Sequence, residues 1–199
     1  MTLLSAGACL ASLAFVALAA YAHAVRREFG RVSTPLSAYF SQPTRGVMFA
    51  AYAALGVALA CTASKILLRG TDGVSDIAAA ASGVLLLVAA ACLMPIALTT
   101  CRRAESDERS TLGRALHRTL SQVAFVAVVV AMLAFSTFGM PAENRGERAL
   151  RVAAVLVSVF AAMLFALSLR LPPGSPHFGT AQKLLAGMVV AWVLICALA

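Results

Sequence analysis

Aspartate, serine and histidine side chains are the groups of this sequence that could carry out chemistry, and they lie between long apolar segments. Residues 101–117 form the most polar stretch and contain Asp107, Ser110 and His117, the residue types of a hydrolytic centre. Closeness in sequence does not make such a centre, because a catalytic triad is defined by its geometry. We therefore assign no catalytic residue and prefer a solvated helix start, with Ser110 or Thr111 as the N-cap.

His23 and His117 would suit a second kind of chemistry. Two histidines on separate helices can ligate a haem in the core of a bundle, provided that their rings face each other across a gap. We prefer the interpretation that both imidazoles form hydrogen bonds near helix ends. No cofactor is therefore predicted, and a haem held by His23 and His117 stays open as an alternative.

The cysteines predict neither a metal site nor a disulfide framework. Their number is odd, no two follow a C-x-x-C spacing, and they lie within or at the ends of apolar segments, at Cys9, Cys61, Cys92, Cys101 and Cys196. Zinc sites and disulfide frameworks use paired spacings that this sequence lacks. The cysteines are expected to act as small apolar packing residues, and no metal ligand is predicted.

Membrane-spanning helices must position all of these residues. The chain has 199 residues, of which 61% are apolar and 12% charged, and its mean hydropathy is +0.91. Soluble domains are closer to half apolar and a quarter charged. Apolar runs of about 20 residues, the length of a membrane span, predict an all-α, polytopic bundle of six transmembrane helices. We expect a single integral-membrane domain over residues 1–199, with spans at about 3–22, 47–68, 77–100, 120–138, 152–169 and 180–199.

The basic residues predict the orientation of this bundle. The net charge is +8, and eleven of the sixteen Lys and Arg residues lie in the loops after the first, third and fifth spans. The positive-inside rule places these loops in the cytoplasm. Both termini are then expected on the non-cytoplasmic side of a bacterial inner membrane. Because headgroup contacts account for the excess charge, membrane lipids are the expected partners and nucleic acid is not.

Acidic residues are absent from all six predicted spans. Proton-coupled transporters usually keep ionisable groups at membrane depth, and their binding sites use broken helices, for which this chain offers only Pro95. Lys65 is the one basic residue inside the first five spans, close enough to the end of its span to extend toward the interface. Small-molecule transport is therefore an alternative and not the main hypothesis.

The loop after the first span is less polar than its length suggests. Pro35 disfavours helix at the preceding residue. Leu36, Tyr39 and Phe40 could then form a short helix under the lipid headgroups, or the same stretch could plug the cytoplasmic mouth of the bundle. The interfacial helix is the preferred interpretation.

Three segments together resemble a family of bacterial and archaeal multi-pass proteins known as domain of unknown function 998. The segments are a Ser-x-Pro-Leu-Ser-x-Tyr loop at Ser33 to Tyr39, a Thr-x-Gly-x-x-x-His element at Thr111, Gly113 and His117, and a last span that starts at Gln182-Lys183-Leu184-Leu185 and continues to Trp192. The resemblance supports six helices but implies no activity. Family members often have an acidic residue shortly after the third span, where this chain offers Asp107 as a substitute.

These observations predict a membrane protein whose enzymatic activity is undecided, with no catalysis as the preferred hypothesis. We expect an accessory or scaffold subunit of a membrane complex, with other membrane-protein subunits as partners, or a lipid-binding protein. The alternatives are a lipid-modifying enzyme at the cytoplasmic interface, a small-molecule transporter, and a haem- or quinone-associated redox protein. The candidate binding residues are Ser37, Tyr39, Asp107, His117 and Gln182.

Overall fold

Six long helices form the described part of the protein. The computed structural model describes residues 2–26, 34–69, 74–105, 111–172 and 175–199, and all regular secondary structure in this part of the chain is helical. The long helices are α1 (Leu3–Val25), α2 (Arg45–Leu68), α3 (Val74–Glu105), α4 (Thr111–Ala134), α5 (Arg145–Arg170) and α6 (Pro176–Leu198). Two short segments accompany them, the 3-10 helix η1 (Leu36–Phe40) and the π-helical turn η2 (Phe135–Gly139), which follows α4 directly. Within these described ranges, six helices are long and apolar enough to cross a membrane, which confirms the predicted fold class.

Several helices extend beyond the predicted spans. The largest differences are at α4, which begins at Thr111, and at α5, which begins at Arg145. Hydropathy marks only the apolar middle of a helix, whereas its polar ends depend on capping. Before α5, the Asn144 side chain accepts a hydrogen bond from the backbone N–H of Glu147 at 2.9 Å, and the Glu147 carboxylate accepts from the backbone N–H of Asn144 at 3.4 Å. This capping box fixes the start of the helix.

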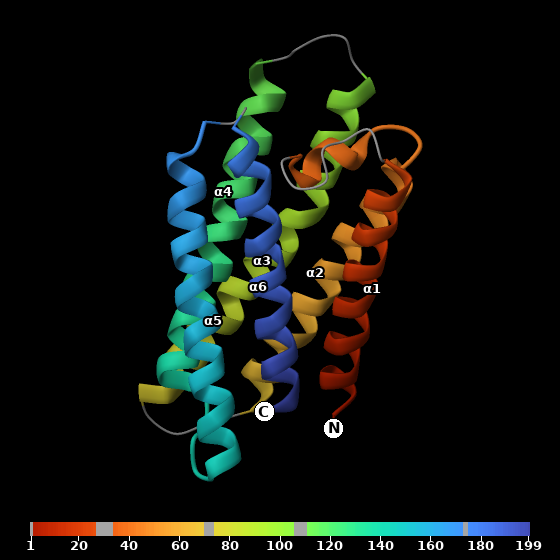
Figure 1. Cartoon of the computed structure of the whole chain (residues 1–199). Coiled ribbons are helices and arrows are strands. Elements are labelled where there is room, and N and C mark those ends of the chain that lie inside the picture. The colour runs from red at the N-terminus through yellow and green to blue at the C-terminus, as the bar shows by residue number, and fades with distance from the viewer. Residues whose placement is uncertain (1, 27–33, 70–73, 106–110, 173–174) are drawn as a thin grey trace.

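The two termini lie at the same end of the bundle, and the C-terminal ends of α1, α3 and α5 lie at the opposite end (Figure 1). Helices adjacent in sequence pack in order from α1 to α4, and α6 packs against both α5 and α1. The fold therefore places the first and last helices side by side. The location of the termini outside the cytoplasm stays a prediction.

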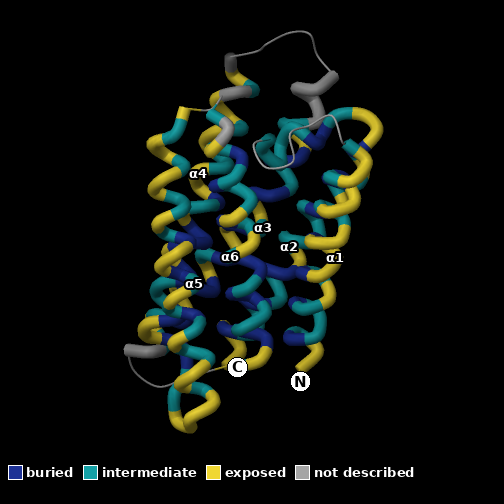
Figure 2. Tube along the Cα trace, viewed as in Figure 1, coloured by how far each residue is buried: buried dark blue, intermediate teal, exposed yellow. Residues whose placement is uncertain are grey.

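Small residues allow the helices to approach closely. Buried residues face the interior of the bundle and exposed residues cover its outside (Figure 2). A Cβ atom at Gly83 of α3 would lie 2.6 Å from Cγ of Leu67 on α2, and one at Gly56 would lie 3.7 Å from the carbonyl oxygen of Ala90. Gly56 therefore lies on a face of α2 that packs against α3. Such faces suit lipid, where van der Waals contact drives helix association.

A buried polar cluster joins η2, α5 and α6. Trp192 Nε1 donates a hydrogen bond to Ser136 Oγ at 2.8 Å, and Ser136 Oγ lies 3.1 Å from Ser158 Oγ. The Ser158 hydroxyl donates to the carbonyl oxygen of Ala154 at 2.7 Å, so the Ser136 hydroxyl is the donor between the two serines. All three residues of the cluster, Ser136, Ser158 and Trp192, are fully buried. The cluster satisfies polar groups that would otherwise be costly to bury.

Lys65 closes the end of the last helix. Its Nζ donates to the carbonyl oxygens of Cys196 at 2.8 Å and Ala197 at 3.3 Å. These carbonyls belong to the last turn of α6, where backbone acceptors lack helical partners and the helix dipole favours a cation. The amine expected to extend toward the interface thus also binds protein.

Candidate functional site

Two neighbouring hollows lie at the end of the bundle opposite the termini and continue toward its middle. The central cavity is lined by residues of α1, α2, α3, α4, α6 and η1, and the centre of a water-sized sphere can occupy about 80 Å³ of it. The lateral groove runs between α1 and α6 and offers about 730 Å³ by the same measure. Phe15, Leu36 and Ala186 line both and form the partition between them.

The η1 segment closes this end of the bundle. Tyr39 and Phe40 are each only 1% exposed, and the Phe40 ring packs edge-on against Tyr52 at 5.0 Å. The Thr44 hydroxyl donates to the carbonyl oxygen of Tyr39 at 2.7 Å, which holds the segment against α2. The expected short helix is present, and its two aromatic rings pack against other helices, as the plug hypothesis predicts. Its position relative to the headgroups stays a prediction. Helix contacts bury the two aromatic rings more completely than a lipid interface would.

Tyr39 joins α1 and α6 at the groove. Its hydroxyl lies 3.4 Å from Nε2 of His23, and the two ring centroids are 4.9 Å apart. The Lys183 Nζ lies 5.5 Å from the centroid of the Tyr39 ring, within the range of a cation–π contact. His23 and Lys183 both line the lateral groove. A buried tyrosine thus positions two nitrogen-bearing side chains at one end of the groove.

His117 is held by two threonines of α3. Its Nδ1 lies 3.1 Å from Thr100 Oγ1 and 3.5 Å from Thr99 Oγ1. The Thr100 hydroxyl donates to the carbonyl oxygen of Ile96 at 2.7 Å, and that of Thr99 to the carbonyl oxygen of Pro95 at 2.9 Å. Since both hydroxyl protons point to backbone, the threonine oxygens accept and Nδ1 is the donor. This assigns the Nδ1–H tautomer to a neutral His117.

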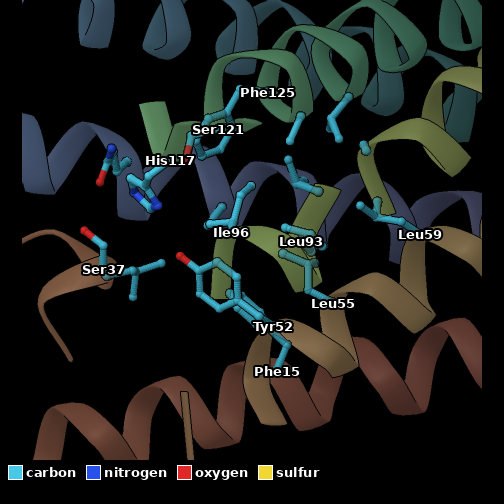
Figure 3. A pocket seen from close by; sticks show the side chains of 17 residues that line it. Phe15, Ser37, Tyr52, Leu55, Leu59, Leu93, Ile96, His117, Ser121 and Phe125 are labelled. Carbon is cyan, nitrogen blue, oxygen red and sulfur yellow. The ribbon is translucent and has the colours of Figure 1, made fainter. Parts of the chain in front are cut away.

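The central cavity brings together three of the predicted binding residues, Ser37, His117 and Gln182 (Figure 3). Tyr39 is not part of its lining and instead contacts His23, and Asp107 lies outside the described residues. Two other polar side chains of the lining, Tyr52 and Ser121, were not predicted. The sequence marks Tyr52 and Ser121 only as polar side chains within apolar spans.

The two candidate haem ligands line different hollows, His117 the central cavity and His23 the lateral groove. A haem ligated by both histidines would need one space that both rings face. The haem site therefore stays an untested alternative. In the described residues, no group of three or more His, Cys, Asp or Glu side chains is arranged to hold a metal ion. Cys9, Cys61, Cys92 and Cys196 are free thiols.

A family model described as protein of unknown function DUF998 matches residues 9–199. Comparisons with curated proteins and with solved structures gave no match. The matched range includes nearly the whole chain, with every residue assigned above to the cavity and the groove. The chain therefore belongs to the DUF998 family of proteins of unknown function.

Proposed function

We propose that this protein binds a lipid of the surrounding bilayer, with an acyl chain in the lateral groove and an anionic headgroup at its polar end. The single observation that carries this proposal is the groove between α1 and α6, which combines apolar walls with His23 and Lys183 at one end. An amphipathic ligand from the membrane matches both features.

The size and lining of the groove suit an acyl chain. Its volume of about 730 Å³ lies within the usual range of ligand pockets. Apart from the two nitrogen-bearing residues its walls are apolar, and small side chains shape most of them, at Ala19, Ala20, Ala24, Ala186, Gly187 and Ala191. An acyl chain in this groove would contact two helices, whereas a lipid on the outer face of one helix contacts only that helix. The groove therefore offers the chain a larger area of van der Waals contact.

The charge at the polar end favours an anionic headgroup. Lys183 supplies an ammonium group and His23 an imidazole, and both are held by the Tyr39 side chain. Lysine binds phosphate as a point charge, and each basic residue near a membrane surface contributes about 1 kcal/mol to binding of anionic lipid. Phosphatidylglycerol is the test lipid of this class.

Filling the groove tests the proposal. A Cβ atom at Gly187 meets no atom within 4 Å, so Gly187→Trp can place its ring in the groove without a clash at the backbone. Gly46 is equally open and lies outside both hollows, which makes Gly46→Trp the matched control. Both variants and the native protein are extracted in mild detergent, and the phospholipid retained per chain is measured by native mass spectrometry.

We expect the native protein and Gly46→Trp to retain phosphatidylglycerol and Gly187→Trp to lose most of it. Equal retention by all three proteins would overturn the proposal. The same spectra report any protein that accompanies the chain, which tests the prediction of an accessory or scaffold subunit. Lipid modification, transport and redox activity stay as the alternatives stated above.

A further inference from the structure

The central cavity has a polar end and an apolar end. Ser37, Tyr52, His117 and Ser121 lie toward one end, whereas Leu59 lies at the other (Figure 3). The polar side chains come from η1, α2 and α4, and Gln182 of α6 adds an amide to the lining. Residues distant in sequence thus supply hydrogen-bonding groups to one small space.

Four of these polar side chains make no hydrogen bond within the described part of the chain, at Ser37, Tyr52, Ser121 and Gln182. All four residues are half-buried, and a polar group that borders an apolar space is stabilised by a hydrogen bond to a molecule bound there. Hydroxyl and amide groups can each donate and accept hydrogen bonds. The four side chains therefore offer both kinds of contact to a molecule in the cavity.

The lining also indicates which charge the bound molecule should have. Among the described residues, no Lys, Arg, Asp or Glu lines the cavity. His117 lines it too, but its Nδ1 is held by the threonines of α3. A charged group would lose its hydration there without gaining a counter-charge from the lining. The chemistry of the cavity therefore favours an uncharged ligand.

We propose that the central cavity is a second binding site, which takes the hydroxyl or carbonyl head of a neutral amphiphile. The head would bind Ser37, Tyr52, Ser121 and Gln182, and its first carbons would lie against the leucines of α2 and α3. The accessible space of about 80 Å³ is roughly six times what one ordered water requires. This suits a head and a narrow chain, but not a bulky headgroup.

The cavity borders the lateral groove. Phe15, Leu36 and Ala186 separate it from the lateral groove, and all three side chains line both hollows. Movement of the Phe15 ring would join the two spaces. A neutral amphiphile can therefore enter from the side of the bundle, and its binding in the cavity does not require that the groove holds a phospholipid.

Photolabelling in nanodiscs tests this site. The probe is 1-dodecanol that carries a diazirine in its chain, and the comparison probe is dodecanoate with the same diazirine at pH 8. The test variant combines Tyr52→Phe with Ser121→Ala, which removes two hydroxyls and keeps the side-chain shapes. The matched control combines Tyr21→Phe with Ser64→Ala, two residues that line neither hollow.

We expect saturable labelling by the alcohol at lining residues of α2, α4 and α6, and much weaker labelling by dodecanoate. Loss of two hydrogen bonds should lower the apparent affinity for the alcohol about tenfold in the test variant, with the control unchanged. Equal labelling by both probes, equal affinity in the test variant, or labelling without saturation would overturn the proposal. The last result would mean that the probe only partitions into the bilayer beside the protein.

Discussion

Tyr39 positions other side chains and does not face the central cavity. It is 1% exposed, and its hydroxyl and ring contact His23 and Lys183 from two different helices. The sequence predicts Tyr39 as a ligand-binding residue. That role stays a prediction; the structure shows that Tyr39 contacts both nitrogen-bearing side chains at the end of the lateral groove.

Replacement of Lys183 should change which lipid is bound. Lys183→Gln removes the ammonium group from the groove and leaves its apolar walls intact. We expect the preference for phosphatidylglycerol over phosphatidylcholine to fall about fivefold, the effect of one basic residue near a membrane surface. Native mass spectrometry from mixed nanodiscs measures this ratio. Arg118→Gln, on an exposed residue of α4 outside both hollows, is the control; an equal loss there would indicate an unspecific effect of charge.

Ser136 should contribute to stability through Trp192. Ser136→Ala leaves the buried Nε1–H of Trp192 without its acceptor at 2.8 Å. We expect the free energy of unfolding in detergent to fall by about 1–2 kcal/mol. Titration with sodium dodecyl sulfate, followed by Trp fluorescence, measures the change. Ser64→Ala serves as the control, and a Ser136→Ala protein as stable as this control would contradict the expectation.

The sequence predicts part of the candidate site and misses part of it, for a physical reason. Ser37, His117 and Gln182 stand out because they lie in polar or motif-like segments, and they do meet in the central cavity. Tyr52 and Ser121 also line it. In a span that is apolar on all sides, periodicity does not distinguish a side chain that faces a cavity from one that faces lipid.

Helix ends depend on features that hydropathy does not report. The apolar middle of each span follows from hydropathy, but the start of α5 depends on the capping box of Asn144 and Glu147. Of the η1 segment, Tyr39 and Phe40 are buried against other helices, whereas the sequence leaves open whether this segment contacts lipid headgroups or the bundle. A short segment of mixed polarity is placed by its neighbours, which the sequence does not specify.

The junction of α2 and α6 should depend on Lys65. Lys65→Met removes the donor to the carbonyl oxygens of Cys196 and Ala197 at the end of α6. We expect the free energy of unfolding to fall by about 1 kcal/mol, the usual size of a cation's interaction with a helix C-terminus. Thermal and detergent unfolding measure it. Lys65→Arg should keep most of the stability, and a Met variant as stable as the native protein would refute this role.

At the scale of the whole molecule, the number of helices follows from the sequence and their lateral order does not. Six apolar segments predict six spans, and the residues that the structure describes include six helices long and apolar enough to cross a membrane. Hydropathy contains no information on which helices touch. The contact of α6 with both α5 and α1 therefore comes only from the structure, and with it the groove between the first and last helices.

The orientation of the bundle gives a direct prediction. In a variant without its native cysteines, single cysteines at Thr2 and Ala199 should react with a membrane-impermeant maleimide in intact cells. A cysteine at Arg118 should react only after the cells are opened, because the loop after the third span is expected in the cytoplasm. If both terminal cysteines were protected in intact cells, the termini would lie in the cytoplasm and the predicted orientation would be wrong.

The most direct measurement is photocrosslinking with phosphatidylglycerol that carries a diazirine in its acyl chain, in liposomes that contain the native protein. We predict that crosslinks concentrate on residues 15–24 of α1 and 183–194 of α6, the stretches that line the groove. Unlabelled phosphatidylglycerol should suppress them. Crosslinks spread evenly over the exposed faces of α4 and α5, and unaffected by competitor, would show that the groove is not a lipid-binding site.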